Sequence, residues 1–188
     1  MSVAATLPPS QRWTREACAR LADYERFELI EGALIPKVSK NHPHSVALVV
    51  IMEWLLEHFR GRRVAPETAI DVRPEDNPAS EPEPDIIVLR GSIAGLGRRP
   101  RPEDLLLVVE IADTTLAFDL STKAKLYARA GIAEYWVADI NGRRMIVHRD
   151  PSGGAYRSAI AYSADDRVSP LAAPQAEIRV AELLLLEQ

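Results

Sequence analysis

The sequence predicts a mixed α/β or α+β fold, with helices and strands arranged around one central sheet. Two short runs rich in Val, Ile and Leu, 85–90 and 105–112, are typical of central strands that are covered on both faces. A long apolar segment without Gly or Pro, 45–59, predicts a largely buried helix. An Asn-Gly pair between two apolar segments predicts a hairpin. No internal repeat and no domain-scale linker interrupts this order.

Composition and charge are those of an ordinary globular protein. With 188 residues, 47% of them hydrophobic, we expect a loose tail over 1–12 and a single domain over 13–188. The single cysteine, Cys18, excludes an internal disulfide and a cysteine-based zinc site and is compatible with a reducing cytoplasm. The net charge of −4 argues against a general nucleic-acid coat protein. We expect a cytoplasmic protein without a membrane partner, because no apolar run approaches the roughly 18 residues of a membrane span and no signal peptide is recognisable.

The N-terminal third predicts a short helix, a hairpin and the long helix. Thr14 can cap the short helix. Alternating polar and apolar residues over 26–38 predict a hairpin. A loop over 39–44 leads to the long helix, which Gly61 ends.

The rest of the chain alternates strands and helices. The predicted elements are, in order, a strand over 67–72, an acidic Pro-rich loop over 73–84, the two central strands, a helix over 119–131 that Gly131 ends, a hairpin over 133–150, a strand over 155–162, and a strand entering a short helix over 176–188.

Each of the two central strands carries one acidic residue. Asp85 opens the first strand, and Glu110 lies near the end of the second, within an apolar run. If the strands are antiparallel neighbours, the two positions meet at the same end of the sheet. A carboxylate in an apolar strand is costly unless it is paired or coordinated. Asp85 is therefore either the end of a loop or a residue of a functional site. Glu110 is either a metal ligand or a buried acid that is bonded to an arginine or to backbone amides.

The predicted helix 119–131 adds a lysine. Asp119, Lys123 and Tyr127 lie at i, i+4 and i+8 and share one face. The Asp–Lys pair could be an ordinary surface pair, or Lys123 could point at the two acids. Two carboxylates suit a hard cation such as Mg²⁺, and a nearby ammonium stabilises the charge that develops on a phosphate under attack. This set predicts phosphodiester hydrolysis, with Tyr127 expected to pack or to bond Lys123.

Two further residues are auxiliary candidates. Glu31 is either an additional acid of the metal site or a residue of the hairpin turn. His44 either lines the site or simply begins the long helix. Asp113 follows Glu110 by three positions, and we expect it to hydrogen-bond the Thr-Thr turn after it.

The segments "EPD", "VVEIADTT" and "DLSTKAKLYARAGIAEYWVAD" together resemble the Uma-two family of restriction endonucleases, a branch of the PD-(D/E)XK nuclease superfamily. The resemblance covers roughly residues 24–183, including the "FELIEGALI" hairpin and His44 ahead of the long helix. The Pro-Asp pair alone would carry no weight, since it occurs by chance in many sequences.

The resemblance implies a restriction-endonuclease-like core, a central mixed sheet flanked by helices, with an added hairpin or meander. It implies that Asp85 and Glu110 are catalytic and bind Mg²⁺, or Mn²⁺ in its place, together with a backbone carbonyl. In the superfamily a lysine lies two positions after the second acid, but here that position is Ala112. Lys123, on the predicted helix that follows, resembles the lysine that has moved to this helix in the Uma-two family. Nucleic acid, DNA before RNA, is the implied substrate, and a homodimer is the implied assembly.

Three functional hypotheses follow. The first is a Mg²⁺-dependent endonuclease in which Asp85 and Glu110 bind the metal and Lys123 assists. The second is a catalytically inactive binding module for nucleic acid or protein, which the net charge of −4 and the missing lysine at Ala112 favour. The third is a structural subunit that docks through its apolar C-terminal "ELLLLEQ".

Overall fold

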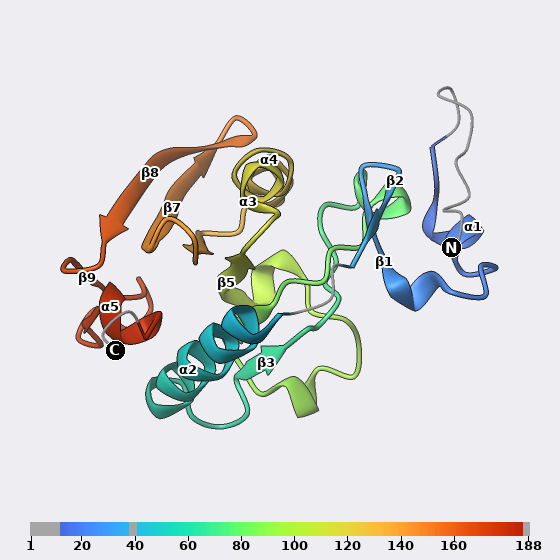
Figure 1. Cartoon of the computed structure of the whole chain (residues 1–188). Helices are drawn as coiled ribbons and strands as arrows, with labels where there is room; N and C mark the ends of the chain where they lie inside the picture. Colours follow the sequence, from blue (N-terminus) through green and yellow to red (C-terminus); the bar gives the residue numbers. More distant parts are fainter. Residues whose placement is uncertain (1–11, 38–40, 186–188) are drawn as a thin grey trace.

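A six-stranded mixed sheet forms the centre of the protein in the computed structural model, which describes residues 12–37 and 41–185 (Figure 1). Its order is β3-β4-β5-β6-β7-β8, and all neighbours are antiparallel except the parallel pair β5–β6. The strands are β3 (Val64–Pro66), β4 (Ile86–Leu89), β5 (Leu105–Ala112), β6 (Glu134–Asp139), β7 (Arg144–Ser152) and β8 (Ala155–Ser163). The predicted mixed sheet with flanking helices is confirmed. The predicted tail lies, except for its last residue, outside the described residues.

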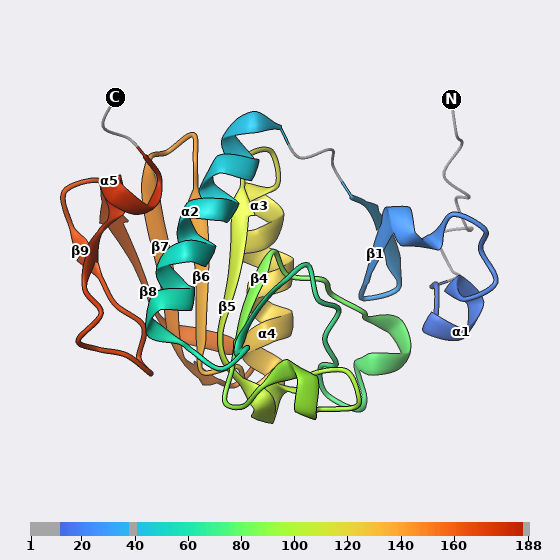
Figure 2. The same cartoon turned by 90° about the horizontal axis from the view of Figure 1, so that it is seen from below.

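Helices cover both faces of this sheet (Figure 2). On one face lie α2 (His42–His58) and α5 (Val180–Leu183), over a core cluster that contains Trp136. On the other face lies one continuous helical segment made of α3 (Leu116–Phe118), the π-helix η5 (Asp119–Lys123) and α4 (Ala124–Ala130). As predicted, Gly131 ends it, in the left-handed conformation. Within the described ranges, no helix has the length and apolar character needed to cross a bilayer.

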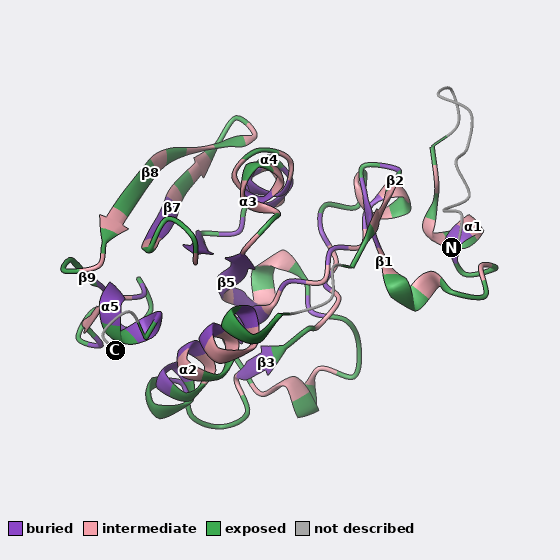
Figure 3. Ribbon diagram, in the orientation of Figure 1, coloured by how far each residue is buried: buried purple, intermediate pink, exposed green. Residues whose placement is uncertain are grey.

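Burial follows this layered arrangement (Figure 3). Every residue of β4 is buried, and so is every residue of β5 except Leu106. The edge strand β8 has only exposed and half-buried residues, with three consecutive exposed residues at 159–161. The two central strands are therefore covered on both faces, as their composition predicts.

The N-terminal region lies beside the sheet and forms a small unit of its own elements. The hairpin β1 (Phe27–Ile30) and β2 (Ala33–Pro36) turns at Glu31 and Gly32, which both have positive φ, as the tight hairpin turn requires. Before it lie α1 (Arg15–Cys18), capped by Thr14 as predicted, and η1 (Tyr24–Arg26). The remaining short elements are η2 (Asn77–Ala79), η3 (Ile93–Gly95), η4 (Pro102–Asp104), β9 (Arg167–Val168) and β10 (Ile178–Arg179).

The strand β3 and the helix α2 differ from the sequence prediction. The strand predicted over 67–72 lies earlier, at β3, and ends at Pro66, which has no N–H for a ladder. The long helix begins at His42, because Asn41 caps it and a proline is tolerated in a first turn. Its outer side is more open than predicted, since Val49 is 53% exposed.

A buried carboxylate fixes the C-terminal segment to the sheet. Glu134 on β6 is fully buried, and its Oε1 accepts hydrogen bonds from Arg149 Nε at 2.9 Å and from Trp136 Nε1 at 2.9 Å. Its Oε2 accepts one from the backbone N–H of Leu171 at 2.8 Å. Among the described residues, Arg149 is the cationic side chain that pairs with Glu134.

We expect Arg149→Met to lower the free energy of unfolding by about 3 kcal/mol, because it leaves Glu134 charged and buried without its cation. Urea denaturation measures this loss. Arg157→Met, on the exposed strand β8, is the matched control and should change stability by no more than about 0.5 kcal/mol. Equal unfolding midpoints for the two variants would contradict the assigned role of Arg149.

Candidate active site

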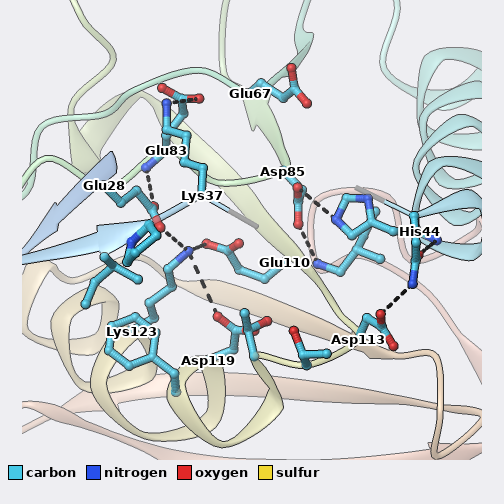
Figure 4. Close-up of a pocket in the computed structure, with 17 residues that line it drawn as sticks. Glu28, Lys37, His44, Glu67, Glu83, Asp85, Glu110, Asp113, Asp119 and Lys123 are labelled. Carbon is cyan, nitrogen blue, oxygen red and sulfur yellow. Dashed lines mark hydrogen bonds and ion pairs between the residues drawn. The ribbon is translucent and has the colours of Figure 1, made fainter. Parts of the chain in front are cut away.

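A pocket of about 220 Å³ lies between the β1–β2 hairpin and the adjoining ends of β4, β5 and the helical segment (Figure 4). Its lining is dominated by acidic side chains, which outnumber the two lysines and one histidine. The seven carboxylates are Glu28, Glu67, Glu83, Asp85, Glu110, Asp113 and Asp119. The pocket is thus suited to a cation, or to an anion that arrives together with one.

The β4–β5 pairing brings Asp85 and Glu110 together. The strands are antiparallel with Ile86 opposite Val109, so that the two acids lie at the same end of the sheet, as the sequence predicts. Asp85 Oδ2 accepts a hydrogen bond from the backbone N–H of Ile111 at 2.8 Å. The other oxygen, Oδ1, lies 3.3 Å from His44 Nε2. The backbone of β5 and the first turn of α2 therefore fix this carboxylate.

Lys123 lies at the centre of a buried cluster of charges. Its Nζ is 2.9 Å from Glu110 Oε1, 3.0 Å from Glu28 Oε2 and 3.9 Å from Asp119 Oδ1. The side chain is only 7% exposed. The lysine thus points into the protein toward the acids rather than lying in a surface pair with Asp119, which decides between the two alternatives that the sequence left open.

The ionisation of this cluster reflects burial and mutual charge. Burial raises the pKa of Glu110 well above its usual value, against the lowering effect of Lys123. Burial also raises the pKa of Asp119, again opposed by Lys123. For Lys123 itself, burial disfavours the ammonium, but the three carboxylates outweigh it and raise the pKa. The lysine is therefore held as a cation among acids that are hard to ionise together.

Sequence reasoning missed Glu28 and did not assign Asp119 to the site. Glu28 comes from β1, and its Oε1 accepts a hydrogen bond from the backbone N–H of Glu83 at 2.7 Å. Asp119 Oδ2 accepts one from Thr115 Oγ1 at 2.5 Å. A signal for Glu28 exists in the sequence, since this acid lies within the apolar stretch "FELI". Its partner could not be read from it, because Lys123 lies almost a hundred positions away.

The auxiliary residues lie partly inside and partly outside the pocket. His44 lines it. Tyr127 packs in the core with its ring edge-on to Tyr135, which is one of the two arrangements expected, and its hydroxyl donates a hydrogen bond to Glu110 Oε1 at 2.8 Å. Glu31 lies outside the lining and pairs with Arg129 at 2.7 Å. Asp113 lines the pocket but accepts hydrogen bonds from Asn41 and Asn141 side chains, instead of bonding the Thr-Thr turn.

The donor set fits a hard divalent cation, although the described residues contain no ready-made group of three or more metal-binding side chains. Carboxylate oxygens are the donors that Mg²⁺ prefers. Both hydrogen bonds to Glu110 from the described part of the chain go to Oε1, which leaves Oε2 for a cation. Carboxylate oxygens have two lone pairs, so that the Asp85 oxygens can bind a cation besides their present partners. Asp85 and Glu110 are thus the residues that could hold a metal here.

We expect Lys123→Met to lower the free energy of unfolding by about 3 kcal/mol at pH 7, because it leaves several buried carboxylates without their shared cation. The deficit should be smaller at pH 5. The reason is that the folded pKa of Glu110 lies above its unfolded value, so that its ionisation opposes folding as pH rises between those two values. Without Lys123, the pKa of Glu110 in the folded protein rises further. The pH range over which ionisation of Glu110 opposes folding therefore extends to higher pH. Urea denaturation at both pH values tests this, and an equal deficit at pH 5 and 7 would contradict it.

Comparisons with known proteins identify the family and the fold. A family model described as "Putative restriction endonuclease", Uma2, matches residues 15–181. The crystal structure of a "putative nuclease belonging to DUF820" from Anabaena variabilis superposes with a TM-score of 0.69 at 17% identity, covering 92% of this chain and 97% of that one. No curated protein matches the sequence. The chain therefore shares the fold of the Anabaena protein and belongs to the Uma2 family.

Proposed function

We propose that the protein is a Mg²⁺-dependent endonuclease that hydrolyses phosphodiester bonds of nucleic acid, with DNA as the substrate. Mn²⁺ would serve in place of Mg²⁺. The observation that supports the proposal is that Asp85, directly before β4, Glu110 of β5 and Lys123 of η5 line one pocket. Membership of a nuclease family supports the reaction class.

Each of the three residues has a separate role in this proposal. A divalent ion held by Asp85 and Glu110 would supply Lewis-acid polarisation of the phosphoryl group and a more acidic water. Lys123 holds Glu110 in place through the 2.9 Å contact to Oε1 and contributes positive charge beside the phosphate. Tyr127 donates a second hydrogen bond to the same oxygen and so helps to hold Glu110. Asp85 is kept in register by the backbone N–H of Ile111.

The same cluster disfavours an inactive binding module. Three carboxylates around one buried ammonium cost desolvation energy, and a purely structural core would be at least as stable with apolar residues of the same size. Strongly shifted pKa values in a pocket are typical of functional sites. Lys123 also supplies the positive charge that Ala112 cannot.

We expect Asp85→Asn and Glu110→Gln each to reduce cleavage of plasmid and single-stranded DNA in Mg²⁺ by about 100-fold or more, because each removes a ligand charge. Gel assays of nicked, linear and fragmented DNA measure this. Glu103→Gln, an exposed acid on η4 at the other end of β5, serves as the control and should retain full activity. Cleavage by the Asp85 variant at the wild-type rate would refute the assignment of this site.

We also propose that the protein forms a homodimer through the outer edge of β8. One edge of the sheet is the short strand β3, which ends in a proline, but β8 is long, lacks Pro, Lys, Asp and Glu, and has Arg157 as its only charge. An open edge of this kind offers backbone donors and acceptors to another strand. Two copies paired antiparallel about Ala159 would place Arg157 opposite Ala161, with no like charges facing each other.

Sedimentation velocity at several concentrations tests the dimer. We expect the wild type to dimerise and Ile160→Lys to shift it to monomer, because Ile160, half exposed on β8, would place two ammonium groups near the twofold axis. Leu56→Lys, at a similarly exposed position on α2, is the control and should still dimerise. A wild type that sediments as a monomer at all concentrations would rule this interface out.

A further inference from the structure

We infer that Glu28, on the N-terminal hairpin, is a positioning residue of the active site that shares the Lys123 ammonium with Glu110 and so keeps Glu110 available to a divalent cation. This inference rests on the proposed function and adds to it a residue from outside the central sheet. It also gives the hairpin β1–β2 a role in the reaction.

The contacts of Glu28 place it between the hairpin and the site (Figure 4). Its Oε2 lies 3.0 Å from Lys123 Nζ, nearly as close as Glu110 Oε1 at 2.9 Å. Its Oε1 is fixed by the backbone N–H of Glu83 at 2.7 Å. The residue is 9% exposed, so that solvent screens this interaction only weakly. Glu28 therefore shares the ammonium with Glu110.

The charge balance of the cluster shows what this sharing does. With all groups ionised, Glu28, Glu110 and Asp119 carry three negative charges and Lys123 carries one positive charge, and Asp85, the other proposed metal ligand, adds a fourth negative charge. A divalent cation compensates part of this negative charge, and buried charge is stable only when it is compensated. Without the charge on Glu28, Lys123 would pair more strongly with Glu110, the proposed metal ligand. Glu28 thus keeps Glu110 available to the metal.

The alternative is that Glu28 only attaches the hairpin to the core. A second ion pair from the same hairpin provides the comparison, because Glu31 contacts Arg129 of α4 at 2.7 Å but does not line the pocket. A purely mechanical role predicts similar effects for neutralising either glutamate. A role in the charge of the site predicts an effect for Glu28 alone.

Calorimetric titration of the metal-free full-length protein with Mn²⁺ distinguishes the two. We expect Glu28→Gln, which keeps the side-chain shape and an oxygen for the Glu83 N–H, to weaken Mn²⁺ binding by about 10- to 100-fold. Glu31→Gln should bind as the wild type does. Glu28→Asp, which retains the charge, should bind Mn²⁺ with an affinity within about 3-fold of that of the wild type. This change is much smaller than the loss of affinity that is typical when an outer contact of a metal site is removed. Thermal melting of each variant verifies that it is folded at the titration temperature.

Three results would overturn the inference. If Glu28→Gln binds Mn²⁺ as tightly as the wild type does, the charge of Glu28 is not needed. DNA cleavage by the wild-type protein would in that case leave the proposed function standing. Equal weakening in Glu28→Gln and Glu31→Gln would assign Glu28 a mechanical role. Absence of Mn²⁺ binding by the wild type itself would overturn the metal dependence of the proposed function, and this inference with it.

Discussion

The buried ammonium of Lys123 is the interaction on which the rest of the site depends. It joins three segments that are distant in sequence, since Glu28 lies on the hairpin, Glu110 on the sheet and Asp119 on the same helical segment as the lysine. None of these carboxylates could be kept charged at this depth without a cation, because the desolvation cost is several kcal/mol per ion. The position of the hairpin and the geometry of the acids are therefore set by one group.

The placement of the lysine on a helix follows from the packing beneath it. Glu110 and Ala112 lie two positions apart on β5 and so face the same side, which the helical segment covers. Ala112 is fully buried in the same core cluster as Ala124, the residue after Lys123. The backbones are thus close enough for Lys123 to reach Glu110 from across the layer. Ala112 on the strand carries no charge. Lys123 on the helical segment supplies the positive charge that a lysine at position 112 would supply.

The sequence predicts the sheet side of the site because that side depends on local patterns. Composition identifies β4 and β5 as central strands, and Asp85 and Glu110 meet at one end of the sheet if these strands are antiparallel neighbours, which the structure shows them to be. Glu28 could not be assigned in this way, since the docking of the hairpin depends on tertiary contacts that leave no periodic trace. The boundaries of β3 and α2 were missed for a different reason. Pro66 and the Asn41 cap act on single residues, which outweigh the composition of the surrounding segment.

The two walls of the pocket are held by different forces, and this difference has consequences for how the site can vary. On the sheet side, Asp85 is bonded to a backbone N–H of β5, and His44 is placed by a helix cap in which Asn41 also bonds Asp113. The hydrogen bond that the backbone N–H of Ile111 donates does not depend on the side chain at position 111. On the hairpin side, the contact with the acids is an ion pair between side chains. Substitutions in the hairpin can therefore adjust the charge of the pocket while the arrangement of Asp85 and Glu110 on the sheet is preserved.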